Sequence, residues 1–377
     1  MSADIRRSFF PLGWTSCGGP AAHLGYFRTE FIGRRGWLTE SSYADLVALS
    51  QFLPGPGSSK VGMALGYHRG GWAGFISAWF WFTLPSALIM AVCGLAFRDA
   101  QLADTPFLTG LLAAAAGVVA HAVYGMARKL LSTLLTWALA IATFVALFWL
   151  SHIVPLLIAA GLGAAFLRRP DLADAPELRP VTARAGWSAL FAFFALLGGL
   201  AAGALTGNWW ATRLNAFYQA GALVFGGGHV ILPLLEDRFV ATGWMNPAEF
   251  FAGYSIAQGL PGPFFTFATY VGAVDRGILG AVVGTVMIFL PGALLMVAGL
   301  YFWSRWRTLP RMRGAFAGVN AAVVGLLTHA LWDPIITHGV TGWATALIAV
   351  AAFAALWFKA PAWSVAVGAA LAGWVLL

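Results

Sequence analysis

Charged residues are scarce in this sequence. Asp, Glu, Lys and Arg together make up 10% of the 377 residues, whereas hydrophobic residues make up 60%. Water-soluble domains carry about 25% charged residues, so a soluble globular fold is excluded and lipid must solvate most of the chain. The 22 basic residues outnumber the 14 acidic ones, but they lie in short gaps between apolar runs. This distribution excludes nucleic acid as a partner and is typical of the basic cytoplasmic loops of membrane proteins.

Cysteines and catalytic motifs are also nearly absent. Cys17 and Cys93 both lie inside apolar runs and have no metal-type spacing, so neither a disulfide framework nor a metal site is expected. The sequence contains no HExxH, no GxSxG and no phosphate-binding loop, which argues against an enzyme. We therefore expect no catalytic residue and no cofactor.

Long apolar runs are abundant, and they predict membrane-spanning helices. A spanning helix needs about 20 mostly apolar residues. Eight charge-free runs provide them: Trp72–Phe97, Pro106–Ala127, Leu130–Leu150, Ala185–Thr212, Gly277–Ser304, Gly314–Trp332, Pro334–Phe358 and Ala360–Leu377. Ile153–Leu167 is shorter, but snorkelling of Arg168 and Arg169 makes it a ninth span. Glycine and proline interrupt four further apolar segments, which are Ser8–Phe27, Leu46–His68, Leu214–Leu235 and Phe250–Val274.

Repeated motifs indicate a tandem duplication. CGGP at Cys17–Pro20 returns as FGGG at Phe225–Gly228, and QFLPGP at Gln51–Pro56 returns as QGLPGP at Gln258–Pro263. Gly36-Trp37 and TLPSAL (Thr83–Leu88) return likewise, and each second copy follows the first by about 207 residues. We assign residues 1–167 to a first repeat, 168–184 to a polar cytoplasmic linker, and 185–377 to a second repeat with one extra leading helix.

The number of crossings predicts that the second repeat is inverted. Each repeat contains two interrupted segments followed by four spans, and the extra helix precedes the second repeat. An odd number of crossings then separates equivalent points, whether the interrupted segments are re-entrant or cross fully. With a cytoplasmic N-terminus most of the 22 basic residues lie inside in both cases. The expected fold is an all-α polytopic membrane protein with two inverted-topology repeats and paired broken or re-entrant helices.

The interrupted segments are the candidate substrate site, because non-helical backbone at membrane depth survives only when it is buried in protein or lines a cavity. Within LPGPGSSK, Pro56 suits the first turn of a new half-helix. The start of that half-helix would offer an anion its open amide groups, two hydroxyls and an ammonium. A structural hinge with a snorkelling lysine is the alternative. The site residues expected from this motif and its copy are Gln51, Gly55, Gly57, Ser58, Ser59, Lys60, Gln258, Gly262 and Thr266.

The glycine-rich breaks supply the remaining candidates. They are Gly18, Gly19, Gly227 and Gly228, which permit tight bends that line a cavity or close packing of helices. His23 and His229 follow these breaks. Either histidine could exchange a proton near neutral pH or serve as a hydrogen-bonded structural residue.

With these motifs in place, the sequence resembles the chromate transporter (CHR) family in its long two-domain form. The resemblance rests on GGPAAHLGYFRTEF (Gly18–Phe31), GWLTESSYADLVALSQFLPGP (Gly36–Pro56), GMALGY (Gly62–Tyr67), FTLPSA (Phe82–Ala87), FGGGHVILPLLE (Phe225–Glu236) and AQGLPGPFFTFATYVGA (Ala257–Ala273). It implies an inner-membrane protein of two oppositely oriented homologous halves. It also implies export of chromate, a tetrahedral dianion that sulfate mimics.

We therefore expect a secondary transporter of tetrahedral oxyanions, with chromate efflux across the bacterial inner membrane as its task. The alternatives are a transporter of sulfate or another oxyanion, and a non-transporting membrane subunit or lipid scramblase. The expected partners are chromate or sulfate as substrate and the lipid bilayer. The sequence leaves a homo-oligomer open.

Overall fold

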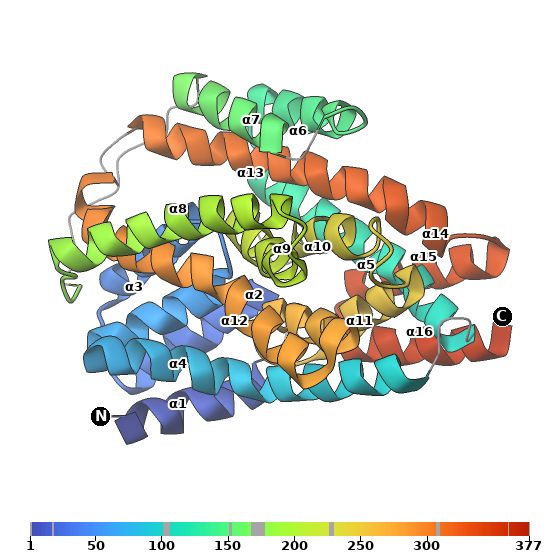
Figure 1. Cartoon of the computed structure of the whole chain (residues 1–377), viewed down its shortest axis with the longest axis horizontal. Helices are drawn as coiled ribbons and strands as arrows, with labels where there is room; N and C mark the ends of the chain where they lie inside the picture. Colours follow the sequence, from blue (N-terminus) through green and yellow to red (C-terminus); the bar gives the residue numbers. More distant parts are fainter. Residues whose placement is uncertain are drawn as a thin grey trace. The chain divides into compact units, whose positions relative to one another are not determined.

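The protein is helical throughout the part of the chain that its computed structural model describes, which is residues 2–16, 19–100, 106–150, 153–166, 178–225, 230–306, 310–360 and 362–376 (Figure 1). The elements are α1 (Ser2–Thr15), α2 (Gly19–Phe27), η1 (Arg28–Arg34), α3 (Glu40–Phe52), α4 (Gly57–Ala100), α5 (Pro106–Leu130), α6 (Leu134–Ala146), α7 (Ile153–Phe166), α8 (Ala183–Leu205), α9 (Trp209–Leu223), α10 (Ile231–Phe239), α11 (Pro247–Gly259), η3 (Phe264–Thr266), α12 (Phe267–Trp306), α13 (Pro310–Ala330), η4 (Leu331–Ile336), α14 (Thr337–Gly339), α15 (Trp343–Trp357) and α16 (Ala362–Leu376).

Several helices suit a bilayer. Among the described residues, four stretches are long and apolar enough to span it, namely Gly57–Arg98, Thr109–Arg128, Ala183–Leu205 and Phe264–Trp303. Large apolar side chains are exposed on their outer faces and on the shorter apolar helices; Phe191 is 76% and Val350 is 66% exposed. Lipid solvates such faces, whereas water would not. The chain is therefore an all-α polytopic membrane protein, as the sequence predicts.

Each of the four segments predicted to be interrupted is divided between two helices. The divisions fall between α1 and α2, α3 and α4, α9 and α10, and α11 and η3. At two of them a glycine has a positive φ, +96° at Gly55 and +89° at Gly262, a conformation that side chains with a Cβ rarely adopt. The predicted breaks are confirmed at these points.

Several predicted spans form shorter helices than expected; Leu130–Leu150, for example, is helix α6 only over Leu134–Ala146. The run Pro334–Phe358 becomes helix α15 only from Trp343 onward. Asp333, which precedes Pro334, has extended backbone angles (φ −137°, ψ 120°), as steric conflict with the proline ring favours. The start of the predicted span therefore forms the short elements η4 and α14.

Helices α4 and α12 both double back on themselves. The reversals lie at Gly70–Gly71 and at Arg276–Gly277, where Gly71 (φ 63°, ψ −148°) and Gly277 (φ 62°, ψ −147°) adopt a conformation open essentially only to glycine. Around each turn the backbones touch, because a Cβ atom on Gly66 would overlap the carbonyl oxygen of Gly74. We call residues 57–69 the short arm of α4 and residues 71–100 its long arm. At about 1.5 Å per residue the short arm is about 20 Å long, too short to cross a hydrocarbon core of about 30 Å.

The helices pack as two compact units. Unit 1 comprises Met1–Asp99, Ala173–Gly228 and Leu260–Trp306, and unit 2 comprises Ala100–Leu172, His229–Gly259 and Arg307–Leu377. Each unit contains segments from both repeats. The boundaries assigned from the sequence, 1–167 and 185–377, thus describe the copies of the duplicated motifs and not the units of packing.

Unit 2 is built by exchange of helices between the repeats. Helix α5 packs against α15 and α16, and α13 packs against α6 and α7 (Figure 1). Since α13, α15 and α16 occupy the places of α5, α6 and α7 in the second repeat, the two arrangements are reciprocal. Glycines allow the close approach: a Cβ on Gly110 would lie 2.8 Å from the Cα of Gly373, and one on Gly163 would lie 2.9 Å from the Cα of Gly318.

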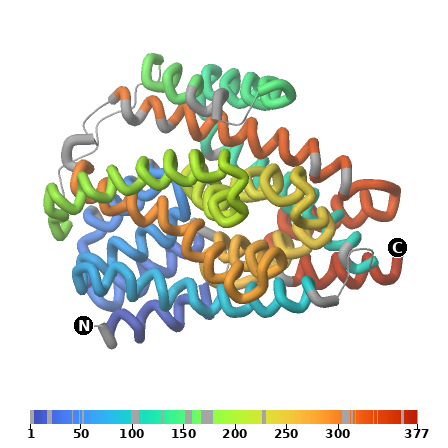
Figure 2. The backbone as a smooth tube through the Cα atoms, in the orientation of Figure 1, coloured from blue at the N-terminus to red at the C-terminus, as the bar shows by residue number. Residues whose placement is uncertain are grey.

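Unit 1 has an aromatic and aliphatic core. Phe9 stacks on Phe31 with ring centroids 4.6 Å apart, and both rings are fully buried. The extra helix α8 packs against α9 and α12 (Figure 2), and the Tyr218 hydroxyl of α9 donates to the carbonyl oxygen of Phe193 on α8 at 3.0 Å. Helix α8 therefore covers both α9 and α12.

Candidate functional site

The break between α3 and α4 begins a new helix inside unit 1. Leu53 is extended (φ −91°, ψ 146°), and the Lys60 amide donates to the carbonyl oxygen of Pro56 at 2.9 Å, which closes the first turn of the new helix. The amide groups of Gly57, Ser58 and Ser59 precede it in the first turn, where a helix supplies no acceptor. Ser58 and Ser59 are 4% and 1% exposed. The site is thus a buried, hydroxyl-bearing helix start.

The two LPGP breaks are tied to the other repeat by matching hydrogen bonds. The Gly55 amide donates to the carbonyl oxygen of Val224 at 2.7 Å, and the Gly262 amide donates to the carbonyl oxygen of Ser16 at 2.9 Å. Gly55 and Gly262 occupy equivalent places in the repeats, as do Ser16 and Val224. Each LPGP turn therefore completes the break of the first interrupted segment in the opposite repeat.

Close backbone contacts follow the same reciprocal pattern. A Cβ on Gly55 would lie 2.9 Å from the Cα of Gly292, and a Cβ on Gly262 would lie 2.8 Å from the Ser86 hydroxyl. Gly292 and Ser86 stand at the same place in the FLPGAL and TLPSAL motifs. Glycine at both LPGP turns is thus required by φ and by the space available.

His23 joins α2 to the helix start of α4. Its Nε2 lies 3.1 Å from the carbonyl oxygen of Ser16, and its Nδ1 lies 3.1 Å from the Ser58 hydroxyl. A carbonyl oxygen only accepts, so Nε2 carries the proton, and in the neutral ring Nδ1 accepts from the Ser58 hydroxyl. His23 and Ser58, expected at the site from the sequence, are brought together there.

Lys60 lies at the site, but its ammonium faces the end of α3. Its side chain is fully buried, and Nζ donates to the carbonyl oxygens of Ser50 at 2.7 Å, Pro54 at 3.0 Å and Leu53. An ammonium has three hydrogens, so these acceptors use all of them. The contacts satisfy carbonyls that the end of α3 leaves open, and the positive charge suits the negative end of its dipole. In this structure Lys60 therefore fits the hinge interpretation better than that of a direct anion ligand.

The second LPGP break has an apolar surrounding. Phe265 and Phe267, next to Thr266, are 3% and 0% exposed. The Thr266 hydroxyl donates to the carbonyl oxygen of Pro263 at 2.9 Å. This half of the site is an aromatic wall, and its one hydroxyl is already bonded.

The remaining predicted residues are placed less fully. Gly19 begins α2 and Gln51 lies in the last turn of α3, where the structure describes only their backbone. Gln258 lies in unit 2, near the end of α11, and is hydrogen-bonded to Tyr254. Gly18, Gly227, Gly228 and His229 lie outside the described residues.

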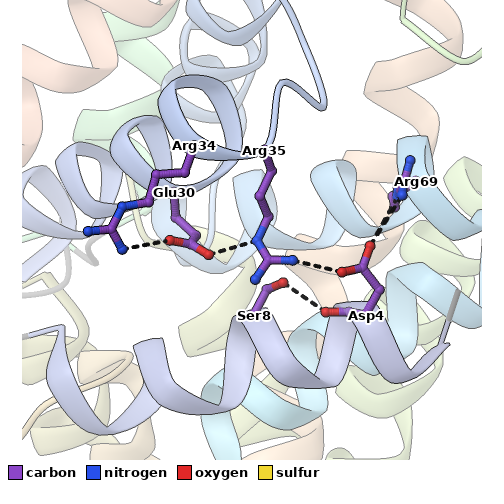
Figure 3. Close-up of polar contacts among 6 residues, drawn as sticks. All are labelled: Asp4, Ser8, Glu30, Arg34, Arg35 and Arg69. Carbon is purple, nitrogen blue, oxygen red and sulfur yellow. Dashed lines mark hydrogen bonds and ion pairs between the residues drawn. The ribbon is translucent and has the colours of Figure 1, made fainter.

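A charged cluster surrounds the turn of α4. The Arg35 guanidinium bridges Asp4 and Glu30, at 2.7 Å to each, and Arg69 approaches Asp4 at 3.3 Å (Figure 3). Arg69 directly precedes the turn, and the Arg179 guanidinium lies against Gly71. We call Asp4, Glu30, Arg34, Arg35 and Arg69 the α4-turn cluster. It ties α1 and η1 to the end of the short arm.

A second set of charges surrounds the turn of α12. Arg213 of α9 pairs with Asp275 at 3.4 Å. The guanidinium groups of Arg213 and Arg276 lie 4.4 and 4.1 Å from the centre of the Trp209 ring, and Arg98 lies against Gly277. An ion pair thus ties the turn of α4 to α1 and the turn of α12 to α9, and these two helices stand at equivalent places in the repeats.

Two apolar grooves lie in unit 2, and the described residues form no metal site. No group of three or more His, Cys, Asp and Glu side chains is placed to hold a metal ion there. Two grooves of about 340 and 330 Å³ in unit 2 are lined almost wholly by apolar side chains such as Leu347, Val350 and Phe353. Such grooves suit lipid chains better than an oxyanion.

Comparison with known proteins finds one family whose members resemble this chain over most of its length. The chromate transporter family model matches it twice, over residues 3–166 and 212–374. A chromate transport protein of Pseudomonas aeruginosa is 29% identical over 98% of this chain and 91% of its own length, and that of Cupriavidus metallidurans is 29% identical over 86% and 80%. The uncharacterized transporter YwrA of Bacillus subtilis is 28% identical over 41% of this chain and 80% of its own length. No solved structure matches the chain.

Proposed function

The chain belongs to the chromate transporter family, and from this premise we propose that it exports chromate across the bacterial inner membrane, with sulfate as an alternative substrate. Relatives that match it over most of their length are named chromate transport proteins. The observation that carries the proposal is the buried helix start at Gly57–Ser59, held against His23 in unit 1. Open amide groups and hydroxyls at a helix N-terminus attract an oxyanion.

Energetics favour export. An inside-negative membrane potential drives a dianion outward by about 4.6 kcal/mol per 100 mV. Outward movement of chromate thus requires no coupled ion, whereas uptake would require one. The uncoupled route is the one we propose.

We also propose that the two repeats have inverted topology. Reciprocal bonds such as Gly55 to Val224 and Gly262 to Ser16 are those of a two-fold relation. With a cytoplasmic N-terminus and re-entrant interrupted segments, Arg35, Arg69 and Arg179 lie inside and Arg98, Arg213 and Arg276 lie outside. The first three gather at the turn of α4 and the last three at the turn of α12. Because the two turns occupy equivalent places in the repeats, this segregation supports opposite orientations.

Transport into inside-out vesicles tests the function. Vesicles containing the full chain should accumulate chromate when the lumen is made electrically positive, and unlabelled sulfate should compete. Vesicles without the protein are the control for leakage. No uptake, together with no rise in melting temperature on addition of chromate or sulfate to the purified protein, would contradict the proposal. Accelerated exchange of a fluorescent lipid without chromate uptake would favour a scramblase.

A further inference from the structure

Four hydrogen-bond donors among the described residues of the first repeat are buried without a partner. They are the hydroxyls of Ser16, Ser59 and Thr83 and the indole N–H of Trp79. Ser16, Ser59 and Thr83 are 0%, 1% and 2% exposed. Leaving a buried polar group unbonded costs about 1–3 kcal/mol, and folded proteins keep few such groups without a reason.

Hydrogen bonds and one ring contact link the surroundings of Ser16, Ser59 and Thr83. The Ser16 carbonyl oxygen binds His23 and Gly262, and His23 binds Ser58, the neighbour of Ser59. The His23 ring also packs edge-on against Phe82, the neighbour of Thr83, at 5.4 Å. All of these residues belong to unit 1.

Two of the donors, Trp79 and Thr83, share one face of the long arm of α4 with Ser86. Trp79, Thr83 and Ser86 are spaced i, i+4 and i+7, so they lie in one line along the helix. Ser86 contacts the Gly262 turn, which places that face toward the second LPGP break. Thr83 lies about 18 Å along the helix from Gly71 and about 22 Å from Arg98. An unbonded hydroxyl there is near the middle of the span, where lipid offers no acceptor.

The second repeat has no such donors at the equivalent positions. Ser16 and Thr83 correspond to Val224 and Phe289. Ser59 corresponds to Thr266, whose hydroxyl is bonded to Pro263, and Trp79 corresponds to Thr285, whose hydroxyl is bonded to Ala281 and Thr269. A need of the fold itself would affect both repeats. The unbonded donors instead belong to one side of a site that is polar on one side and apolar on the other.

On the basis of the proposed function, we infer that Ser16, Ser59, Thr83 and Trp79 are the substrate ligands, and that they hold a tetrahedral oxyanion by uncharged donors alone. Lys60 is occupied by the end of α3, so its charge acts on the anion only from a distance. Three of these ligands lie outside the set that the sequence predicts. The signal for two of them was the contrast between aligned positions, Ser16 against Val224 and Thr83 against Phe289.

Substitution of these four residues tests the inference, because removing a substrate ligand should weaken chromate binding without lowering the stability of the protein. The variants are Ser16→Ala, Ser59→Ala, Thr83→Val and Trp79→Phe in the full chain, purified in detergent. The matched controls are Ser8→Ala and Ser50→Ala, since both hydroxyls are buried but already bonded to backbone carbonyls. Melting temperature is measured without ligand, and chromate and sulfate affinity is measured by calorimetry.

Each test variant should bind chromate about 10- to 100-fold more weakly and melt at the same or a higher temperature without ligand. The controls should melt lower and bind as the unmodified protein does. If the unmodified protein binds chromate and all four test variants bind it with unchanged affinity, the inference about the ligands is overturned. The proposed function would then still stand. Absence of chromate and sulfate binding by the unmodified protein would overturn both.

Discussion

The amide of Gly55 donates a hydrogen bond to the carbonyl oxygen of Val224 at 2.7 Å, although the two residues belong to different repeats. The same bond recurs from Gly262 to Ser16 at 2.9 Å. Each repeat thus supplies the acceptor for the other's LPGP turn. Neither turn is complete within its own repeat, so changes at one repeat should affect the site that both form.

Gly55→Ala and Gly262→Ala should each destabilise the protein by about 1–3 kcal/mol. Both residues have a positive φ, and an added Cβ would press on Gly292 or on Ser86. The melting temperature in detergent measures the loss. Gly57→Ala is the matched control, because a Cβ there meets nothing within 4 Å. Equal melting temperatures for Gly55→Ala and Gly57→Ala would contradict the described turn.

Lys60→Met should lower stability strongly, because it leaves the carbonyls of Ser50, Leu53 and Pro54 without a donor. Each unpaired buried carbonyl costs about 1–3 kcal/mol. The measurement is folded yield and melting temperature, with Lys359→Met, at an exposed position, as the control. A stable Lys60→Met protein that binds chromate much more weakly would instead restore the lysine as an anion ligand.

Gly71→Ala should destabilise the hairpin of α4 by about 1–3 kcal/mol, since its backbone angles are closed to other residues. Gly70→Ala provides an internal control. The equivalent position in the second repeat is Arg276, which adopts nearly the same angles (φ −144°, ψ 30°) with a full side chain. We expect Gly70→Ala to be tolerated apart from a small shift of Ile5. A lower melting temperature for Gly70→Ala than for Gly71→Ala would contradict the backbone conformation described for this turn.

Asp4→Asn should destabilise the α4-turn cluster by about 0.5–1.5 kcal/mol, because Asp4 is bound by both Arg35 and Arg69 and its side chain is 32% exposed. The loss should shrink at high salt. Glu40→Gln, which breaks the isolated pair with Arg28 at side-chain exposures of 60% and 63%, is the control and should change the melting temperature little. An equal drop in melting temperature for Asp4→Asn and Glu40→Gln would mean that the α4-turn cluster contributes no more stability than an isolated surface ion pair.

Paired cysteines test the orientation of the repeats. Arg34→Cys and Ala241→Cys stand at equivalent places and are exposed, in a chain whose Cys17 and Cys93 are replaced by serine. A membrane-impermeant thiol reagent should label position 34 only from the cytoplasmic side and position 241 only from the other side. Labelling of both from one side would require parallel repeats.

Much of the local structure follows from the sequence, because its causes are local. Proline and glycine in LPGP predict the breaks before Gly57 and Phe264. The sequence also locates the turn at Gly70–Gly71, because one interrupted segment is predicted to end at His68 and the next span to begin at Trp72. The role of Lys60 could not be predicted in this way. It depends on where the carbonyls at the end of α3 point, which is a property of the folded turn.

Contacts between helices that are distant in the chain could not be predicted from the sequence either, because they too depend on the folded structure. The lengths of their apolar runs predict α5 and α13 as spans, but neither run indicates that each helix packs on helices of the other repeat. His23 was predicted as a site residue, but its hydrogen bond to Ser58 could not be predicted, because a break in the helices separates the two residues. Ser16 and Thr83 stand out only when the contacts of both repeats are compared.

The reciprocal packing of unit 2 sets an order of events during synthesis. Helix α5 ends at Leu130, whereas α16, on which it packs, begins at Ala362. A ribosome that adds about 5–20 residues per second takes about 10–45 s to make the chain between them. Until α16 is made, the part of α5 around Gly110, on which α16 packs, is exposed to lipid. Assembly of this unit is therefore a late event, completed only after the last helix has entered the membrane.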